Sequence, residues 1–232
     1  MLFRQLFEPV TSTCTYLIAD EVSREAALID PVAEEVPRYE RLLAELGLRL
    51  VYTLETHVHA DHVTGAALLR DHLGSRSVAH RDAGAACADV LVDEGDALHL
   101  GAVRIDVLAT PGHTAACVSY RVGDRVLTGD ALLIGATGRT DFQGGDAGRL
   151  YDAITTRLFS LPDDTLVYPG HDYQGDRVST IGREKARNAR AGQGRSRTEF
   201  ITILDALALP YPKLMDRAVP ANRACGSEVG HG

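Results

Sequence analysis

Four residues within six positions carry the strongest chemical signal in this chain: His57, His59, Asp61 and His62, in the stretch THVHADH at 56–62. Imidazole nitrogens and carboxylate oxygens are ligands that proteins offer to Zn, Fe and Mn. Nine histidines in 232 residues would rarely cluster in this way by chance. The pattern therefore predicts a metal-binding loop. The plainer alternative is that these histidines cap a helix or are hydrogen-bonded core groups.

Three further ligand-type residues each follow a short apolar run. His113 follows the run 103–109 in the stretch TPGHT, Asp130 follows 126–129, and His171 follows 167–170. Any one of them alone could be structural. Because strand ends on one side of a sheet converge, we expect these residues and the histidine loop to meet at one site.

The elements that must position these residues follow from the hydrophobic pattern. Alternation predicts two or three strands in the first thirty residues, with turns at Glu8-Pro9 and Asp20-Glu21. Helical spacing predicts a helix over 34–46, ended by Gly47, and a second helix that begins near Asp61 and runs to Leu73. Between them, the apolar run 50–54 is a buried strand that leads into the histidine loop.

The rest of the chain repeats this alternation of strands and helices. Further strands are predicted at 77–79, 97–100, 103–109, 117–122, 125–128 and 165–168, with a helix at 147–159. The region from about residue 174 is helical in pattern and is broken late by Pro210, Pro212 and Pro220. We expect a single α/β domain over 1–232, a sandwich with helices outside the sheets and a short helical, proline-containing C-terminal extension.

Composition and charge exclude several classes of protein. The formal net charge is -8, with 24 basic against 32 acidic residues, which argues against a nucleic-acid partner. No apolar run approaches a membrane span, and the N-terminus lacks the features of a signal peptide. The four cysteines are scattered without a CxxC pair, so we expect reduced, mostly buried thiols; Cys225 should be the more exposed, and its role stays open. A cytoplasmic protein with no membrane partner is the expectation.

Four motifs together resemble the metallo-β-lactamase superfamily, in its glyoxalase II-like branch: THVHADH at 56–62, PGHT at 111–114, TGDALL at 128–133 and GHDY at 170–173. More narrowly, GDALLI at 129–134, GRTDFQG at 138–144 and AVPAN at 218–222 resemble the persulfide dioxygenases. The likeness extends from about Phe3 to Gly226. It implies an αββα sandwich, with two mixed sheets and helices on the outer faces.

The resemblance also implies a metal and a reaction. One Fe(II) per chain would be held by the residues that match His57, His113 and Asp130, a two-histidine, one-carboxylate set that leaves coordination positions open. The surrounding residues His59, Asp61, His62 and His171 would orient ligands and hold water. The implied reaction is oxidation of glutathione persulfide by O2 and water to sulfite and glutathione, in a protein expected to be a homodimer.

Two positions bear on the glutathione part of such a substrate. In relatives of the glyoxalase II branch, a basic residue and a tyrosine at the places of Arg139 and Tyr173 bind glutathione. An ordinary surface ion pair for Arg139 and a packed aromatic ring for Tyr173 are the alternatives. Asp141 stands where the hydrolases commonly carry an aromatic contact to glutathione, which weakens a hydrolase interpretation and leaves that contact unassigned.

Every ligand of a two-metal hydrolase is also present, so ligand identity alone does not decide between the two enzymes. The alternative is a thioester hydrolase of the glyoxalase II type, acting on S-lactoylglutathione with Zn or a second metal at Asp61, His62 and His171. Only 61 residues follow His171, which is short for that class. A catalytically silent scaffold of the same fold is the third possibility.

Overall fold

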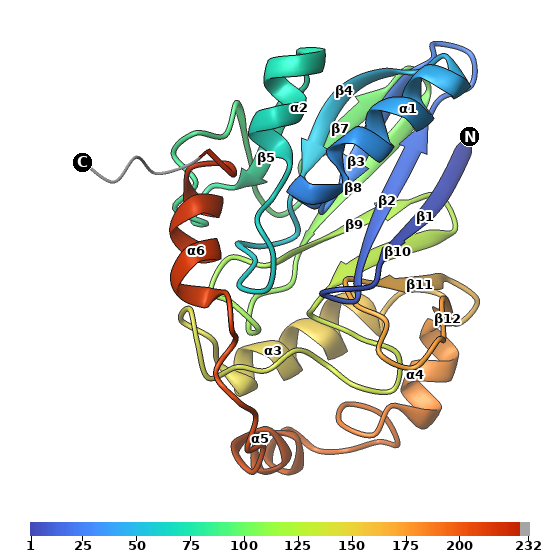
Figure 1. The fold of residues 1–232 in the computed structure, drawn as a ribbon. Helices are drawn as coiled ribbons and strands as arrows, with labels where there is room; N and C mark the ends of the chain where they lie inside the picture. The colour runs from blue at the N-terminus through green and yellow to red at the C-terminus, as the bar shows by residue number, and fades with distance from the viewer. Residues whose placement is uncertain (228–232) are drawn as a thin grey trace. The chain divides into compact units, whose positions relative to one another are not determined.

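The structure, a computed structural model, describes residues 1–227 (Figure 1). The chain forms two compact units. Unit 1 contains Met1–Val92, Leu98–Arg104 and the described residues from Tyr211 on, and unit 2 contains Asp93–Ala97 and Ile105–Pro210. The boundaries of a single domain over 1–232 stay a prediction.

Unit 1 is built on a six-stranded sheet in the order β1-β2-β3-β4-β5-β6. The first three strands are antiparallel neighbours and the last four are parallel neighbours, so the sheet is mixed. The strands are β1 (Leu2–Glu8), β2 (Thr13–Ala19), β3 (Glu25–Ile29), β4 (Arg49–Leu54), β5 (Arg76–His80) and β6 (Val90–Val92). The strands predicted within the first thirty residues are confirmed, whereas the three-residue strand β6 was not predicted.

Helix α1 (Val36–Leu46) covers the core of unit 1 through the residues that gave it helical spacing. Val36, Tyr39 and Leu43 are buried together with Leu17 and Leu28 of the sheet. A short 3-10 turn, Ala33–Glu35, precedes the helix, and Gly47 ends it in the left-handed conformation at φ 60°. The prediction of a helix over 34–46 is confirmed, with its first turn wound more tightly.

Helix α2 (Ala66–Leu73) begins later than predicted, so the expectation that it starts near Asp61 is wrong. The segment before it stays a loop because its polar groups are bonded elsewhere. The backbone carbonyls of His59 and His62 accept hydrogen bonds from a side chain of another segment, and the Thr64 hydroxyl accepts one from Ala66 N. A helix starting at Asp61 would pair the Ala66 amide with the His62 carbonyl and so break the bond from Ala66 N to the Thr64 hydroxyl.

Unit 2 holds most of a second mixed sheet, in the order β12-β11-β10-β9-β8-β7. Its pairs are antiparallel from β8 to β10, β10 pairs with β11 in parallel, and β11 with β12 antiparallel. The bounds are β7 (Ala97–Leu100), β8 (Val103–Ala109), β9 (Val118–Val122), β10 (Arg125–Gly129), β11 (Leu166–Pro169) and β12 (Ser179–Thr180). These agree with the predicted strands to within one or two residues, and β12 was not predicted.

The helices of unit 2 close one core with this sheet. Helix α3 (Ala147–Ala153) continues as a π-helical turn, Ile154–Leu158, and α4 (Ile181–Arg187) and α5 (Arg197–Asp205) follow. Leu150 and Ile154 of the first and Phe200 of the last are fully buried with Val126 and Val167. Ser196 and Glu199 form a capping box at the start of α5.

The C-terminal helix α6 (Met215–Arg223) belongs to unit 1 and contains Pro220 in its interior. The prediction that Pro220 breaks the helix is therefore wrong. The proline ring is exposed, so the carbonyl that loses its N–H partner can bond to water instead. No helix among residues 1–227 is long and apolar enough to cross a membrane.

The cysteines correct a further expectation. Cys87 and Cys225 form a disulfide across 138 residues of sequence, and Cys225 is buried rather than exposed. The remaining two, Cys14 and Cys117, are buried and form no disulfide, as predicted. A pairing of this kind leaves no local spacing signal, because it depends on where α6 packs within unit 1.

Candidate metal centre

The histidine loop, residues 56–62, follows directly after β4 and gathers three imidazole rings within unit 1. The ring centroids of His57 and His59 lie 4.1 Å apart, and those of His59 and His62 lie 4.3 Å apart. All three histidines are at least nine-tenths buried. The loop histidines thus cluster, as predicted, and all three belong to unit 1.

Asp30, at the end of β3, fixes the first two histidines. Its carboxylate accepts hydrogen bonds from Thr56 N at 2.7 Å, from the Thr56 hydroxyl at 2.8 Å and from His59 Nε2 at 3.0 Å. Because the Thr56 hydroxyl donates its hydrogen bond to Asp30, the hydroxyl oxygen is left to accept a hydrogen bond from His57 Nδ1 at 3.0 Å. The other nitrogen, His57 Nε2, then carries the lone pair that a metal would use.

His59 lies in a strongly acidic setting. Burial alone would lower its pKa, but the carboxylates of Asp30 and Glu55 outweigh burial and raise the pKa of His59 well above its ordinary value. Glu55 lies 3.4 Å from His59 Nε2. Asp61 accepts from His62 Nδ1 at 2.9 Å, and the ligand-type atoms of His59, Asp61 and His62 lie within 4.8 Å of one another. This trio could hold a cation or an ordered water.

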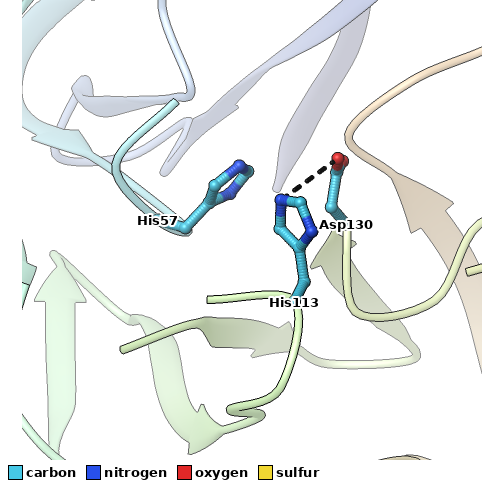
Figure 2. Close-up of side chains that lie close together, drawn as sticks. All are labelled: His57, His113 and Asp130. Carbon is cyan, nitrogen blue, oxygen red and sulfur yellow. Dashed lines mark ion pairs between the residues drawn. The ribbon is translucent and has the colours of Figure 1, made fainter. Parts of the chain in front are cut away.

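His113 and Asp130 lie close together in unit 2, at the ends of β8 and β10. His113 Nε2 is 3.6 Å from Asp130 Oδ2 (dashed line in Figure 2). His113 Nδ1 donates to the carbonyl oxygen of Arg139 at 2.7 Å, which places the proton on Nδ1 of the neutral ring. The Nε2 lone pair then faces a carboxylate oxygen, an arrangement that a cation bound to both atoms would stabilise. The nitrogen and oxygen donors here fit a metal.

The second oxygen of Asp130 has similar surroundings. Asp130 Oδ1 is 3.6 Å from His171 Nε2, and it is buried without a hydrogen-bond partner among the described residues. A buried carboxylate oxygen in this condition is costly unless a cation or water reaches it. Two glycines permit the crowding. A Cβ at Gly170 would lie 2.7 Å from Asp130 Oδ1, and one at Gly138 would lie 2.7 Å from His113 Nδ1.

The Arg139 side chain, also in unit 2, is already engaged. Its Nε and Nη2 donate to Asp141 at 2.6 Å each, and Nη1 and Nη2 donate to the carbonyls of Pro210 and Leu209. The hydrogen bond from Arg139 holds the pKa of Asp141 below its usual value. Arg139 and Asp141 line a cleft of about 450 Å³ with Leu204, Leu207 and Leu209. Arg139 therefore forms an ion pair with Asp141, which was the alternative interpretation of this residue, and binding of glutathione by Arg139 stays a prediction.

Tyr173 is 68% exposed, and its ring stacks on His171 at a centroid distance of 5.4 Å. Both interpretations of Tyr173 are compatible with this position, since an exposed ring can pack on a histidine and still present its hydroxyl to a ligand.

The predicted site residues thus form two sets. Unit 1 contains His57, His59, Asp61 and His62, and unit 2 contains His113, Asp130, Arg139, His171 and Tyr173. Sequence reasoning missed the roles of Thr56, within the histidine loop, and of Asp30 and Asn222, whose side chains bond to that loop. The rule that strand ends converge could have found Asp30, because it follows the strand 25–29 next to β4.

Comparisons with known proteins extend over the whole chain. Residues 9–171 match the metallo-beta-lactamase superfamily. Persulfide dioxygenase ETHE1, mitochondrial, of Homo sapiens is 49% identical, covering 99% of this chain and 90% of that protein. The crystal structure of ETHE1 from Myxococcus xanthus has a TM-score of 0.96 at 55% identity, covering 98% and 100%. Hydroxyacylglutathione hydrolase of Polaromonas sp. is 37% identical, covering 73% and 66%.

Proposed function

Because this chain belongs to the metallo-beta-lactamase superfamily and, within it, to the persulfide dioxygenase family, we propose that it oxidises glutathione persulfide with O2 and water. The products are sulfite and glutathione. The terminal sulfur receives two oxygen atoms from O2 and one from water, four electrons pass from that sulfur to O2, and two protons are released. The observation that carries this proposal is near-full-length identity of about half the residues to persulfide dioxygenases.

The hydrolase alternative has weaker support. The hydroxyacylglutathione hydrolase matches 73% of this chain, whereas the persulfide dioxygenases match 98% or more. The motifs that distinguish the dioxygenases, GRTDFQG at 138–144 and AVPAN at 218–222, include residues that touch the two ligand sets, because the Arg139 carbonyl orients His113 and Asn222 bonds to the histidine loop.

The metal of this proposal is one Fe(II) per chain, held by His57, His113 and Asp130, the three side chains labelled in Figure 2. Support comes from the protonation that each histidine's partner imposes. The Thr56 hydroxyl accepts a hydrogen bond from His57 Nδ1, and the Arg139 carbonyl accepts one from His113 Nδ1. The proton of each ring is therefore on Nδ1, and Nε2 carries the lone pair that can bind a metal. Iron bound by two histidines and a carboxylate supplies open coordination positions at which a sulfur and dioxygen can react.

Other side chains of the protein orient the proposed metal ligands and supply hydrogen-bond donors and acceptors beside them. His59, Asp61 and His62 hold fixed donors and acceptors beside His57, and His171 lies beside Asp130. Arg139 and Tyr173 are proposed to bind the glutathione part, Arg139 through the cleft that it lines. The homodimer and the cytoplasmic location stay predictions.

Oxygen uptake tests the proposal. Protein loaded anaerobically with one Fe(II) per chain should consume one O2 per sulfite formed when glutathione persulfide is added. The metal-free protein and the iron protein without persulfide are the controls. Absence of persulfide-dependent uptake by the iron-loaded protein would refute the proposal. Turnover of S-lactoylglutathione with two metals per chain would instead support the hydrolase.

A further inference from the structure

Helix α6 ends against the histidine loop through one buried side chain. Asn222 Nδ2 donates to the carbonyl of His59 at 2.9 Å and to that of His62 at 2.8 Å, and Asn222 Oδ1 accepts from Thr64 N at 2.8 Å. Asn222 is 6% exposed. Two carbonyls of the loop and one amide just after it are therefore bonded to a residue about 160 positions later in the chain.

The residues after Asn222 also contact the segment that follows the histidine loop. The carbonyl of Cys225 accepts from Ala67 N at 2.8 Å, in the first turn of α2, where no side chain caps the helix. Gly226 lies so close to the carbonyl of Thr64 that no Cβ could be placed there. We call residues 222–226 the C-terminal clamp, since they bond to the loop and to the helix that follows it.

A disulfide fastens the C-terminal clamp to the rest of unit 1. Cys225 is bonded to Cys87, in the segment between β5 and β6, and no other covalent link joins these segments within residues 1–227. Disulfides in reducing compartments are uncommon and are usually transient or redox-responsive. Opening this one would leave the clamp held by hydrogen bonds and packing alone.

We propose that Asn222 is a positioning residue for the histidine loop and that the Cys87–Cys225 disulfide keeps Asn222 in place. Retention of the metal then depends on whether this disulfide is oxidised or reduced. Two molecules of glutathione, a product of the proposed reaction, would reduce the disulfide. One thiolate attacks the half-buried Cys87, which releases the Cys225 thiolate, and the second resolves the mixed disulfide, so that two protein thiols and one glutathione disulfide form. The inference rests on the proposed metal site but not on persulfide chemistry.

The first test compares iron release from three anaerobic, Fe(II)-loaded samples: the oxidised protein, the protein reduced with a phosphine and desalted, and Cys87→Ser. Thiol titration under denaturing conditions should find two thiols in the oxidised sample and four in the reduced one. Transfer of iron to a ferrous chelator should be about 10-fold faster in the last two samples, the size of effect seen when groups that orient ligands are lost. Arg217→Ala, an exposed change on the same helix, should match the oxidised protein.

The second test replaces Asn222 with an isosteric residue. Asn222→Asp keeps the acceptor for Thr64 N and the packing, but removes both donors to the loop carbonyls. Oxidised Asn222→Asp should release iron as fast as the reduced wild type, and reduction should accelerate it little further. Hydrogen exchange at the amide of Ala67, which donates to Cys225 of the C-terminal clamp, should rise in parallel, with or without metal.

Several outcomes would overturn the inference. Four thiols in the protein before reduction would contradict the redox part of the inference. Equal rates of iron release before and after reduction of the wild type would contradict it too. Wild-type behaviour of Asn222→Asp would remove the positioning role. Protein that retains iron in a redox-dependent way, but consumes no oxygen with persulfide, would contradict the proposed function and leave this inference standing.

Discussion

The carboxylates beside the histidine loop of unit 1 and the carboxylate of Asp130 in unit 2 are in opposite conditions. In unit 1, the carboxylates of Asp30 and Asp61 each accept hydrogen bonds from loop side chains. In unit 2, Asp130 Oδ1 is buried without a hydrogen-bond partner in the described part of the chain, and the lone pair of His113 faces its other oxygen. The carboxylates of Asp30 and Asp61 are thus held by the protein itself, whereas Asp130 stands to gain most from a cation. In unit 1 the unsatisfied atoms are ring nitrogens: His59 Nδ1 and His62 Nε2 are buried without a hydrogen-bond partner among residues 1–227.

Removal of Asp30, one of the carboxylates held by the protein, should give the largest effect on stability. Asp30→Ala leaves His59 and two Thr56 donors buried without their acceptor. Loss of one partner from a buried charged network costs about 3–5 kcal/mol. We expect that decrease in the free energy of unfolding, measured by urea denaturation of the metal-free protein. Asp163→Ala, which removes an exposed ion pair with Lys185, should leave it nearly unchanged; equal losses would contradict the account.

Thr56 should affect metal binding more than stability. Thr56→Val removes the oxygen that fixes the Nδ1 proton of His57, and we expect metal affinity to fall about 10- to 100-fold, measured by competition with a chelator. Thr53, in strand β4 just before the loop, offers a matched control, because its buried hydroxyl has no hydrogen-bond partner among residues 1–227. Thr53→Val should bind metal like the wild type. An equal loss in both variants would show that the hydroxyl of Thr56 does not orient His57.

The smallest expected effects concern Arg139 and Asp141, because in the proposed function Asp141 and the glutathione part of the substrate compete for the guanidinium of Arg139. Arg139→Ala should raise KM for glutathione persulfide, whereas Asp141→Asn should lower it by roughly 2- to 5-fold, the size of a partly exposed ion pair. The pKa of Asp141 is lowered by Arg139, so the pair persists above that value and is lost only as pH falls through it. KM should therefore stay flat between about pH 6 and 8, and a rise of KM in Asp141→Asn would exclude competition.

Much of this arrangement could be predicted from the sequence because the signals are local. The apolar runs before His113, Asp130 and His171 are strands, as predicted, and all three of these ligand-type residues belong to unit 2; that they are metal ligands or their neighbours stays a prediction. The helix over 36–46 follows from the spacing of Val36, Tyr39 and Leu43, with Gly47 as its stop.

What could not be predicted depends on contacts between distant segments. The segment before the late start of α2 is bonded by Asn222 at His59 and His62, contacts that no helical propensity at Asp61 can reveal. The disulfide of Cys87 joins residues 138 positions apart, and the role of Asp30 needs the parallel pairing of β3 with β4. In each case the partner lies far along the chain, so its effect appears only once the fold is known.

Metal content of two histidine variants tests the central claim, a single iron held by His57, His113 and Asp130, most directly. We predict that His113→Ala, purified anaerobically and loaded with Fe(II), retains almost no iron, since one of three protein ligands is gone. We predict that His171→Ala, like Asp61→Ala, retains close to one iron per chain, because its side chain orients a ligand rather than binding the metal. Loss of iron from His171→Ala as complete as that from His113→Ala would contradict the mononuclear site.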